Sequence, residues 1–301
     1  MDFSSSTRLY DLSWRDSGPS VLVESWWGRE ALSEGFELCV DVLSTDAHIE
    51  LKAFLGQGAT LWSALPDGTR SGRSALVRSA FKLGADGGFA RYRLVLVPWS
   101  WLLTQTRHNR VFQDRSVIDI VEQVFAGHGS FAAWQWSDEV SAFLSQVRPR
   151  SYCVQYHETD YAFVSRLLAE EGIGWAMEED DTAPAGHRMR LFADSAGFED
   201  DVQSTEAGIR FHRADSQEDS DAILALGAHR KLGLGVGTTL SYDYKAKSIV
   251  ATSLPSRQAP GGPNAPVLED YDDAGLYAYA NRAEAEHYAT LMLEAREARF
   301  K

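Results

Sequence analysis

Residues 151–175 change their hydrophobic period twice, and this predicts a strand, a helix and a second strand. Residues 152–157 alternate between two sets, as in a strand with one buried face and one solvated face: Tyr152, Val154 and Tyr156, and Cys153, Gln155 and His157. Apolar residues then recur at helical spacing, at Tyr161, Phe163, Val164, Leu167 and Leu168. Thr159 is the expected N-cap, with the Asp160 carboxylate at the positive end of the helix dipole and Gly172 at the helix end. A returning strand follows at Ile173, Trp175 and Met177.

The first hundred residues have the pattern of short strands. Apolar positions alternate with polar ones at Phe36, Leu38, Val40 and Val42, and again at Tyr92, Leu94 and Leu96. Asp86, Gly87 and Gly88 predict a hairpin turn before the second of these strands. Short strands joined by glycine-rich turns favour a small barrel or a sandwich.

Two further helices are expected. In the first, over 116–126, Ser116 caps the helix, Asp119 completes a box-like arrangement, and Gly127 ends an apolar stripe. After about residue 200 the strand pattern returns around Tyr242, Tyr244 and Ile249, and the proline-rich stretch 255–266 predicts a loop. The second helix begins near Asn281, has Glu284 at its third position, and carries four residues on one face: Tyr288, Leu291, Met292 and Ala295.

The segment that predicts strand, helix and strand also resembles a family signature, that of the VgrG spike proteins of bacterial type VI secretion systems. The residues that carry this resemblance are Tyr152, Gln155, Tyr156, Glu158, Asp160, Phe163, Arg166, Leu167, Glu171 and Gly172. Further segments are similar to the same family in the same order, at 36–44, 49–56, 94–99, 109–114, 191–194 and 271–279. The resemblance therefore runs from about residue 20 to the C-terminus.

The resemblance implies an α+β, β-rich fold like that of the tailed-phage baseplate hub, with two small β-barrel tube domains and an intervening α+β domain. The implied domains are a first barrel at 1–108, an α+β middle domain at 109–200, and a second barrel region with a linker and a C-terminal helix at 201–301. VgrG-like chains continue into a further barrel and a β-helical needle. We therefore expect this chain to be the N-terminal hub segment, either excised from a longer protein, which we favour, or a naturally short product.

The implied function is structural. A homotrimer would form a pseudo-sixfold platform that docks on the Hcp tube, contacts baseplate components, and carries the needle with effector or adaptor proteins. The implied location is the cytoplasm before firing, followed by delivery outside the cell or into a target cell. The family signature residues are expected to be structural, and no catalytic, cofactor-binding or metal-ligating residue is expected. The hub of a phage-like contractile particle is a close alternative.

Composition restricts the possible partners. Lysine and arginine total 29 against 43 acidic residues, which gives a formal net charge of -14 and argues against a nucleic-acid partner. No apolar run approaches the roughly 20 residues that span a bilayer, and the first residues lack a signal-peptide pattern. The only cysteines, Cys39 and Cys153, form neither a disulfide framework nor a metal cluster, which fits folding in a reducing cytosol.

Motifs for chemistry are weak. His157 begins a stretch like the zinc-protease helix, but Tyr161 stands where the second histidine belongs, and the eight histidines lack metal-pair spacing. The glycines at 233, 235 and 237 depart from the dinucleotide-binding spacing and indicate close strand packing or a bulge. There is no Gly-x-Ser-x-Gly elbow for a nucleophilic serine.

Two alternatives remain open from the residues alone. Acidic clusters at 178–181 and at Asp270, Asp272 and Asp273 are candidates for a carbohydrate hydrolase, although solvated loops explain them more simply. Several tryptophans are candidates for a glycan-binding platform, or equally for core and subunit contacts: Trp26, Trp27, Trp99, Trp101, Trp134 and Trp136. A hydrolase requires two carboxylates in a cleft, whereas a lectin requires an exposed aromatic platform.

Overall fold

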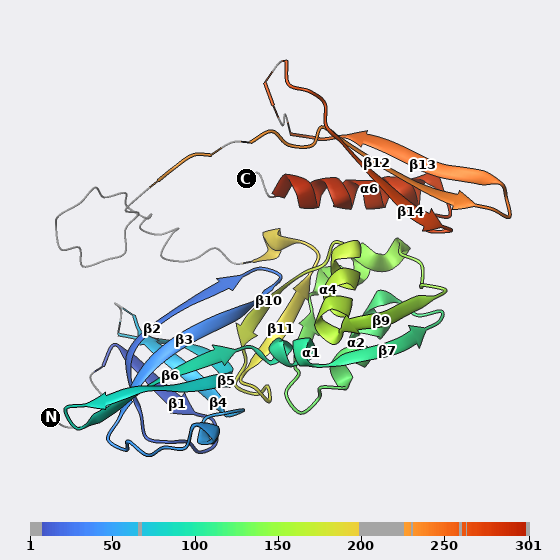
Figure 1. Cartoon of the computed structure of the whole chain (residues 1–301). Coiled ribbons are helices and arrows are strands. Elements are labelled where there is room, and N and C mark those ends of the chain that lie inside the picture. The colour runs from blue at the N-terminus through green and yellow to red at the C-terminus, as the bar shows by residue number, and fades with distance from the viewer. Residues whose placement is uncertain are drawn as a thin grey trace. The chain divides into compact units, whose positions relative to one another are not determined.

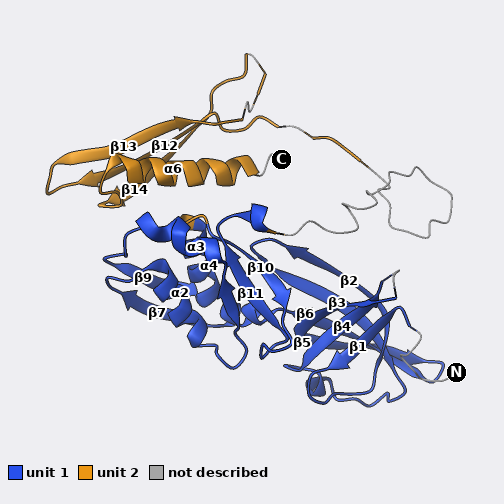
Figure 2. Ribbon diagram, turned by 180° about the vertical axis from the view of Figure 1, so that it is seen from behind, with its two compact units in different colours: residues 1–169, 173–197 blue, residues 170–172, 198–301 orange. Residues whose placement is uncertain are grey.

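The computed structural model describes residues 8–65, 68–198, 226–229, 231–258, 261–262 and 264–298. The chain divides into two compact units, coloured in Figure 2. Unit 1 comprises residues 1–169 and 173–197, and unit 2 comprises residues 170–172 and 198–301. Part of the predicted second barrel, residues 201–225, lies outside the described residues. The boundaries at 108/109 and 200/201 stay predictions.

Unit 1 begins with an antiparallel six-stranded sheet in the order β1-β4-β5-β6-β3-β2 (Figure 1). The strands are β1 (Tyr10–Trp14), β2 (Leu22–Ala31), β3 (Glu34–Ser44), β4 (Gly58–Ala64), β5 (Arg70–Asp86) and β6 (Phe89–Val97). The sheet curls so that its outer strands approach each other. Arg8 Nη1 donates to Val23 O at 2.9 Å, and the rings of Tyr10 and Trp26 meet edge to face. The result is a half-barrel whose edges β1 and β2 are not paired by a strand ladder.

The alternation predicted for the first hundred residues is confirmed. Every predicted inward position of β3 and β6 is buried: Phe36, Leu38, Val40, Val42, Tyr92, Leu94 and Leu96. Because each is apolar and lies on the same face as its cross-strand partner, together they form the barrel core with Leu12, Phe54 and Leu61. The turn between β5 and β6 is the predicted two-residue hairpin, with positive φ at Gly87 (60°) and Gly88 (85°).

The remainder of unit 1 is an α+β region. Its helices are α1 (Leu102–Gln105), α2 (Val117–Ala126), α3 (Asp138–Phe143) and α4 (Asp160–Glu170), with short 3-10 turns at Leu51–Ala53 in the barrel and at Trp99–Trp101, Leu144–Gln146 and Ser195–Gly197. Its strands are β7 (Arg107–Phe112), β8 (Trp134–Trp136), β9 (Cys153–Thr159), β10 (Gly174–Glu179) and β11 (His187–Phe192). They form two small sheets, β10-β11-β8 and β7-β9. The predicted Ser116 cap is confirmed, because Ser116 Oγ accepts from Asp119 N at 3.1 Å and the Asp119 carboxylate accepts from Ser116 N.

The predicted strand, helix and strand at 151–175 are β9, α4 and β10. Thr159 Oγ1 accepts from Ala162 N at 3.1 Å, as a cap should. Gly172 has φ 70°, and Ile173 N donates to Leu168 O at 2.8 Å, which is a Schellman closure of α4.

Unit 2 contains a three-stranded sheet and one helix among its described residues. The strands β12 (Val236–Asp243), β13 (Ser248–Pro255) and β14 (Glu269–Leu276) lie in the order β13-β12-β14, and α6 spans Arg282–Glu297. The Asn281 cap is confirmed by a bond from Glu284 N at 3.0 Å.

The predicted buried face of α6 is wrong. The predicted set was Tyr288, Leu291, Met292 and Ala295, whereas the structure buries Ala285, Ala289, Leu293 and Glu297. The helix lies so close to the sheet that a Cβ at Gly237 would come within 2.9 Å of Leu293 and Met292. The missing side chain of Gly237 leaves room for Leu293 and Met292, and the small Ala285 and Ala289 are buried on the same helix. At Gly237 the glycine run therefore packs against a helix, where close strand packing or a bulge was expected.

The whole is an α+β, β-rich fold, as the sequence predicted. Among the described residues, no helix is both long and apolar enough to cross a bilayer.

The hairpin turn offers a test of backbone strain alone, because a Cβ at Gly87 would meet nothing within 4 Å. We expect Gly87→Val to lower the free energy of unfolding by about 1–3 kcal/mol, since a β-branched residue is strained at positive φ. Gly87→Asn, the matched control, should cost clearly less because asparagine tolerates that conformation. Equal losses in urea denaturation would contradict the turn assignment.

Candidate functional site

The carboxylate of Asp160, the first residue of α4, is fully buried. Three groups donate to Oδ1: His108 Nδ1 at 2.9 Å, Arg110 Nη1 at 2.8 Å and Gln155 Nε2 at 2.8 Å. Three donate to Oδ2: Thr106 Oγ1 at 3.1 Å, His128 Nε2 at 3.0 Å and Arg110 Nη2 at 3.4 Å. The site therefore joins β7, β9, the end of α2 and the start of α4 (Figure 1).

The network keeps this carboxylate ionised. Burial alone raises the pKa of Asp160, but hydrogen bonds from Gln155, His128, His108 and Arg110 outweigh it and hold the pKa well below its usual range. An ionised carboxylate only accepts, so the protons lie on Nδ1 of His108 and Nε2 of His128. The Arg110 guanidinium supplies the compensating positive charge.

This arrangement is unsuited to catalysis. A carboxylate offers about four acceptor positions, and six donors already occupy them, so Asp160 has no free position for a substrate proton. Within the described ranges, no three histidine, cysteine or acidic side chains are grouped to hold a metal ion. His157, the start of the zinc-like stretch, is exposed, and its backbone N–H donates to Asn109 Oδ1 at 2.9 Å.

The structure gives the other signature residues different surroundings. Phe163 and Leu167 are fully buried in the α+β core. Glu158 pairs with Arg166 at 2.7 Å, and Glu171 accepts from Tyr288 within unit 2. The structural role assigned to the set stays a prediction.

The alternation of the signature strand is confirmed as far as Tyr156, with polar Gln155 on its buried face, but His157, predicted on the same face as Cys153 and Gln155, is exposed at a bulge. Cys153 and Gln155 are buried, while Tyr152 and Tyr156 are 62% and 69% exposed. Gln155 faces inward because its amide bonds both Asp160 and Arg110. The exposed tyrosines are the signature residues whose position folding does not explain.

Four residues of the network were missed by the sequence reasoning: Thr106, His108, Arg110 and His128. They lie between 32 and 54 positions from Asp160, and no local spacing connects them. The available signal was Gln155, a polar residue at an inward position of a strand, which requires a buried polar partner.

Several members of the acidic clusters considered for hydrolysis are engaged in structural contacts. Glu178 pairs with Arg188 and Arg190, Glu179 accepts from Ser74 N at 2.8 Å, and Asp180 accepts from Thr182. In unit 2, Asp270 pairs with Arg296 at 3.2 Å.

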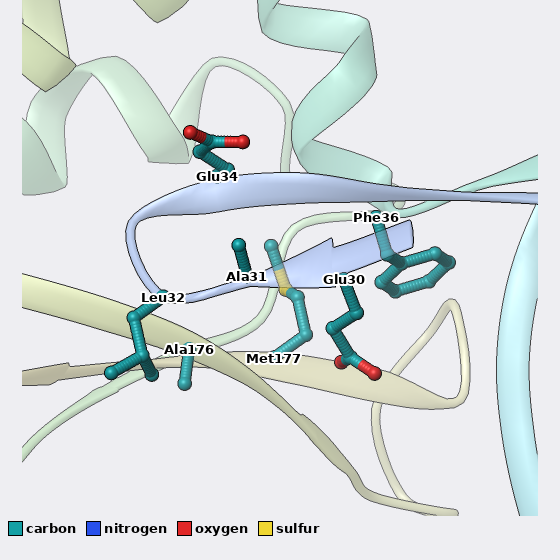
Figure 3. Close-up of a pocket in the computed structure, with 7 residues that line it drawn as sticks. All are labelled: Glu30, Ala31, Leu32, Glu34, Phe36, Ala176 and Met177. Carbon is teal, nitrogen blue, oxygen red and sulfur yellow. The ribbon is translucent and has the colours of Figure 1, made fainter. Parts of the chain in front are cut away.

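A shallow pocket of about 260 Å³ lies between the β2–β3 hairpin and β10 (Figure 3). Its two carboxylates, Glu30 and Glu34, point away from each other and pair with Arg73 and Arg29. Volumes of about 300–1,000 Å³ are usual for ligand sites, so the pocket lies below the usual range.

The tryptophans do not form an exposed platform. All nine lie in the described residues, and Trp27 alone is largely exposed, at 48%. Arg93 covers its ring at 4.5 Å. Trp99 is fully buried.

A second buried polar group, His187, joins the barrel to the α+β region. Its Nε2 accepts from Trp99 N at 2.9 Å, which requires the proton on Nδ1, where it donates to Ala185 O at 3.0 Å. Burial lowers the pKa of His187 to about 4, and Arg15 adds a smaller unfavourable charge. The neutral ring is therefore part of the fold.

Replacing Asp160 by asparagine should lower the free energy of unfolding by about 3 kcal/mol, because Arg110 loses its charge partner and the new amide N–H₂ faces donors. Glu158→Gln, which breaks an exposed pair, is the control and should cost within about 1 kcal/mol. The folded pKa is lowered, so this stability is present above about pH 4 and is lost as the pH falls further. Denaturant titrations of the two variants reaching equal midpoints would contradict the buried network.

His187 should titrate in a separate window. Its folded pKa is below the ordinary value of 6.5, so the unfolded chain binds the proton first. The free energy of unfolding should fall by about 3 kcal/mol as the pH drops from 6.5 to 4. His187→Gln retains an acceptor for Trp99 N without titrating, and its pH profile should be flatter there. Parallel profiles in calorimetry would count against this assignment.

Comparisons with known proteins agree with this geometry. The profile of the family described as phage tail baseplate hub (GPD) matches residues 29–301. The chain is 28% identical over 308 residues to the type VI secretion system spike protein VgrG1b of Pseudomonas aeruginosa, covering 100% of this chain and 39% of that protein. It is 38% identical over 157 residues to VgrG1a of the same organism, covering 52% of this chain and 24% of that protein. The resemblance to VgrG proteins is thereby confirmed, and the chain spans well under half the length of these curated relatives.

Solved structures show the same fold. The E. coli c3393 protein, described as a component of the type VI secretion system similar to T4 tail proteins gp27 and gp5, has a TM-score of 0.55 and 22% identity, over 90% of this chain and 68% of that one. A 43 kDa tail protein of prophage MuSo2 from Shewanella oneidensis has a TM-score of 0.56 and 12% identity, over 97% and 80%. The chain belongs to the phage tail baseplate hub (GPD) family.

Proposed function

We propose that this chain is the hub portion of a type VI secretion spike, and that its role is architectural. The observation that carries the proposal is the family match across residues 29–301, on a curled six-stranded barrel sheet followed by an α+β region. The spike proteins of Pseudomonas aeruginosa support the choice of apparatus. A phage-like particle remains the close alternative.

The proposed assembly is a ring of three copies. Two barrel domains per chain would give six barrels, a platform for the Hcp tube, with baseplate components, needle and effector or adaptor proteins as further partners. Such a hub would stay in the cytoplasm until firing and then leave through the apparatus.

The proposed mechanism makes no covalent bond. Asp160 is saturated with hydrogen-bond donors, Glu30 and Glu34 point apart, and the carboxylates at 178–180 hold neighbouring strands. These observations favour neither the hydrolase nor the glycan-binding alternative. Shape and symmetry matching over a large cyclic interface would suffice.

The test is to mix the purified chain with purified Hcp rings and to measure masses by native mass spectrometry and light scattering. We expect three chains per Hcp hexamer, and three-copy rings of the chain at high concentration. The control is each component alone. A chain that stays monomeric and releases sugars from peptidoglycan fragments would overturn the proposal in favour of an enzyme.

A further inference from the structure

The strand pair β7-β9 and its flanking loops are basic in an otherwise acidic chain. Residues 107–115 and 148–159 contain five arginines and two histidines against two acidic residues, Asp114 and Glu158, while the whole chain has a formal net charge of -14. The strands lie side by side in Figure 1, so these charges gather in one region of unit 1.

The outer face of this pair is also apolar and aromatic. Val111 is 57% exposed, and with Tyr152 and Tyr156 it lies on the face opposite the Asp160 network. Arg107 and Arg115 are exposed at the ends of β7, and neither has an acidic partner among the residues that the structure describes. We name these five residues, Arg107, Val111, Arg115, Tyr152 and Tyr156, the β7–β9 platform. Tyrosine and arginine are enriched in the centres of protein–protein interfaces.

The Asp160 network holds the β7–β9 platform rigid from its buried side. Arg110 and Gln155, which pair across the two strands, bond each other at 2.9 Å and both bond Asp160. Asn109 Oδ1 accepts from His157 N and fixes the bulge beside Tyr156. A surface that is already ordered loses little conformational entropy on binding.

The chain itself carries a surface of opposite charge. Strand β14 begins Glu269, Asp270, Tyr271, Asp272, Asp273, and it is an edge of its three-stranded sheet as described. Tyr271 is 58% exposed, and Glu269, Asp272 and Asp273 are exposed without an ion pair among the described residues. Acidic side chains around an exposed tyrosine complement arginines around exposed tyrosines.

We propose that the β7–β9 platform of one copy binds the acidic strand β14 of a second copy. The contact is heterologous, and it closes a ring when the rotation between neighbouring copies is a whole fraction of a turn. This inference rests on the three-copy assembly proposed above and adds the surfaces that form it. Its ionic part makes the assembly sensitive to salt.

Charge exchange tests the contact in the full chain. Arg107→Glu with Arg115→Glu should lower the association constant about tenfold or more in light scattering, as should Asp272→Lys with Asp273→Lys, and combining all four should restore it. The matched control, Arg29→Glu with Lys52→Glu, alters two exposed cations of the barrel and should assemble like the unchanged chain.

A second measurement locates the contact. A photo-crosslinking residue at Tyr156 in a mixture of nitrogen-14 and nitrogen-15 chains should yield mixed-isotope crosslinks to β14. Crosslinks that join only chains of the same isotope would show that the platform does not bind β14 of a second copy. Failure of the four-residue exchange to restore assembly would show the same. A variant with either charge reversal that still forms trimers like the unchanged chain overturns the contact and leaves the proposed function standing. A chain that is monomeric at every concentration overturns both.

Discussion

A buried carboxylate has lost its contacts with water, so its negative charge needs hydrogen-bond donors or a positive charge beside it. At Asp160 this requirement organises the α+β region. The donors come from four places: the chain before β7, β7 itself, the end of α2, and β9. Each donor must lie within hydrogen-bonding distance of the carboxylate, because the loss of one partner leaves part of the buried charge without compensation. The bulge opposite Asn109 meets this condition by realigning β7 and β9 between His108 and Arg110.

Periodicity predicted the local elements well because it reports one-sided burial. The inward positions of β3 and β6, the Ser116 box and the Gly172 helix end depend on neighbours a few residues away, so the sequence contains their signal. The Asp160 environment depends on pairing between β7 and β9, which local spacing does not encode. Asp160 was therefore predicted as a simple dipole charge, and His108 and His128 as scattered histidines. The face of α6 failed for a related reason: the strand that it packs against is distant in sequence, and there Gly237 leaves room for the side chains of Leu293 and Met292.

Contacts between residues distant in sequence also explain why candidate catalytic carboxylates are found in contacts within the fold. Several of the carboxylates that attracted attention in the sequence are bonded to arginines, backbone N–H groups or hydroxyls, whereas Asp272 and Asp273 make no ion pair among the described residues. Groups committed in this way add geometric precision, since charged hydrogen bonds constrain both distance and direction. A catalytic carboxylate needs the opposite condition, which is access to a substrate and a pKa near the working pH.

Copies of such an acidic chain can associate only where a local surface of positive charge meets a negative one. Copies with a net charge of -14 repel one another, but salt screens that repulsion beyond about 8–10 Å. Contacts at about 3–4 Å act inside this distance, so a small basic surface can dominate when it meets an acidic one. Arg107 and Arg115, which are exposed beside this rigid strand pair, therefore restrict the orientations in which an acidic neighbour is attracted. A ring closes only when each copy meets the next in the same orientation. For ring closure, a restricted orientation therefore matters more than a high affinity.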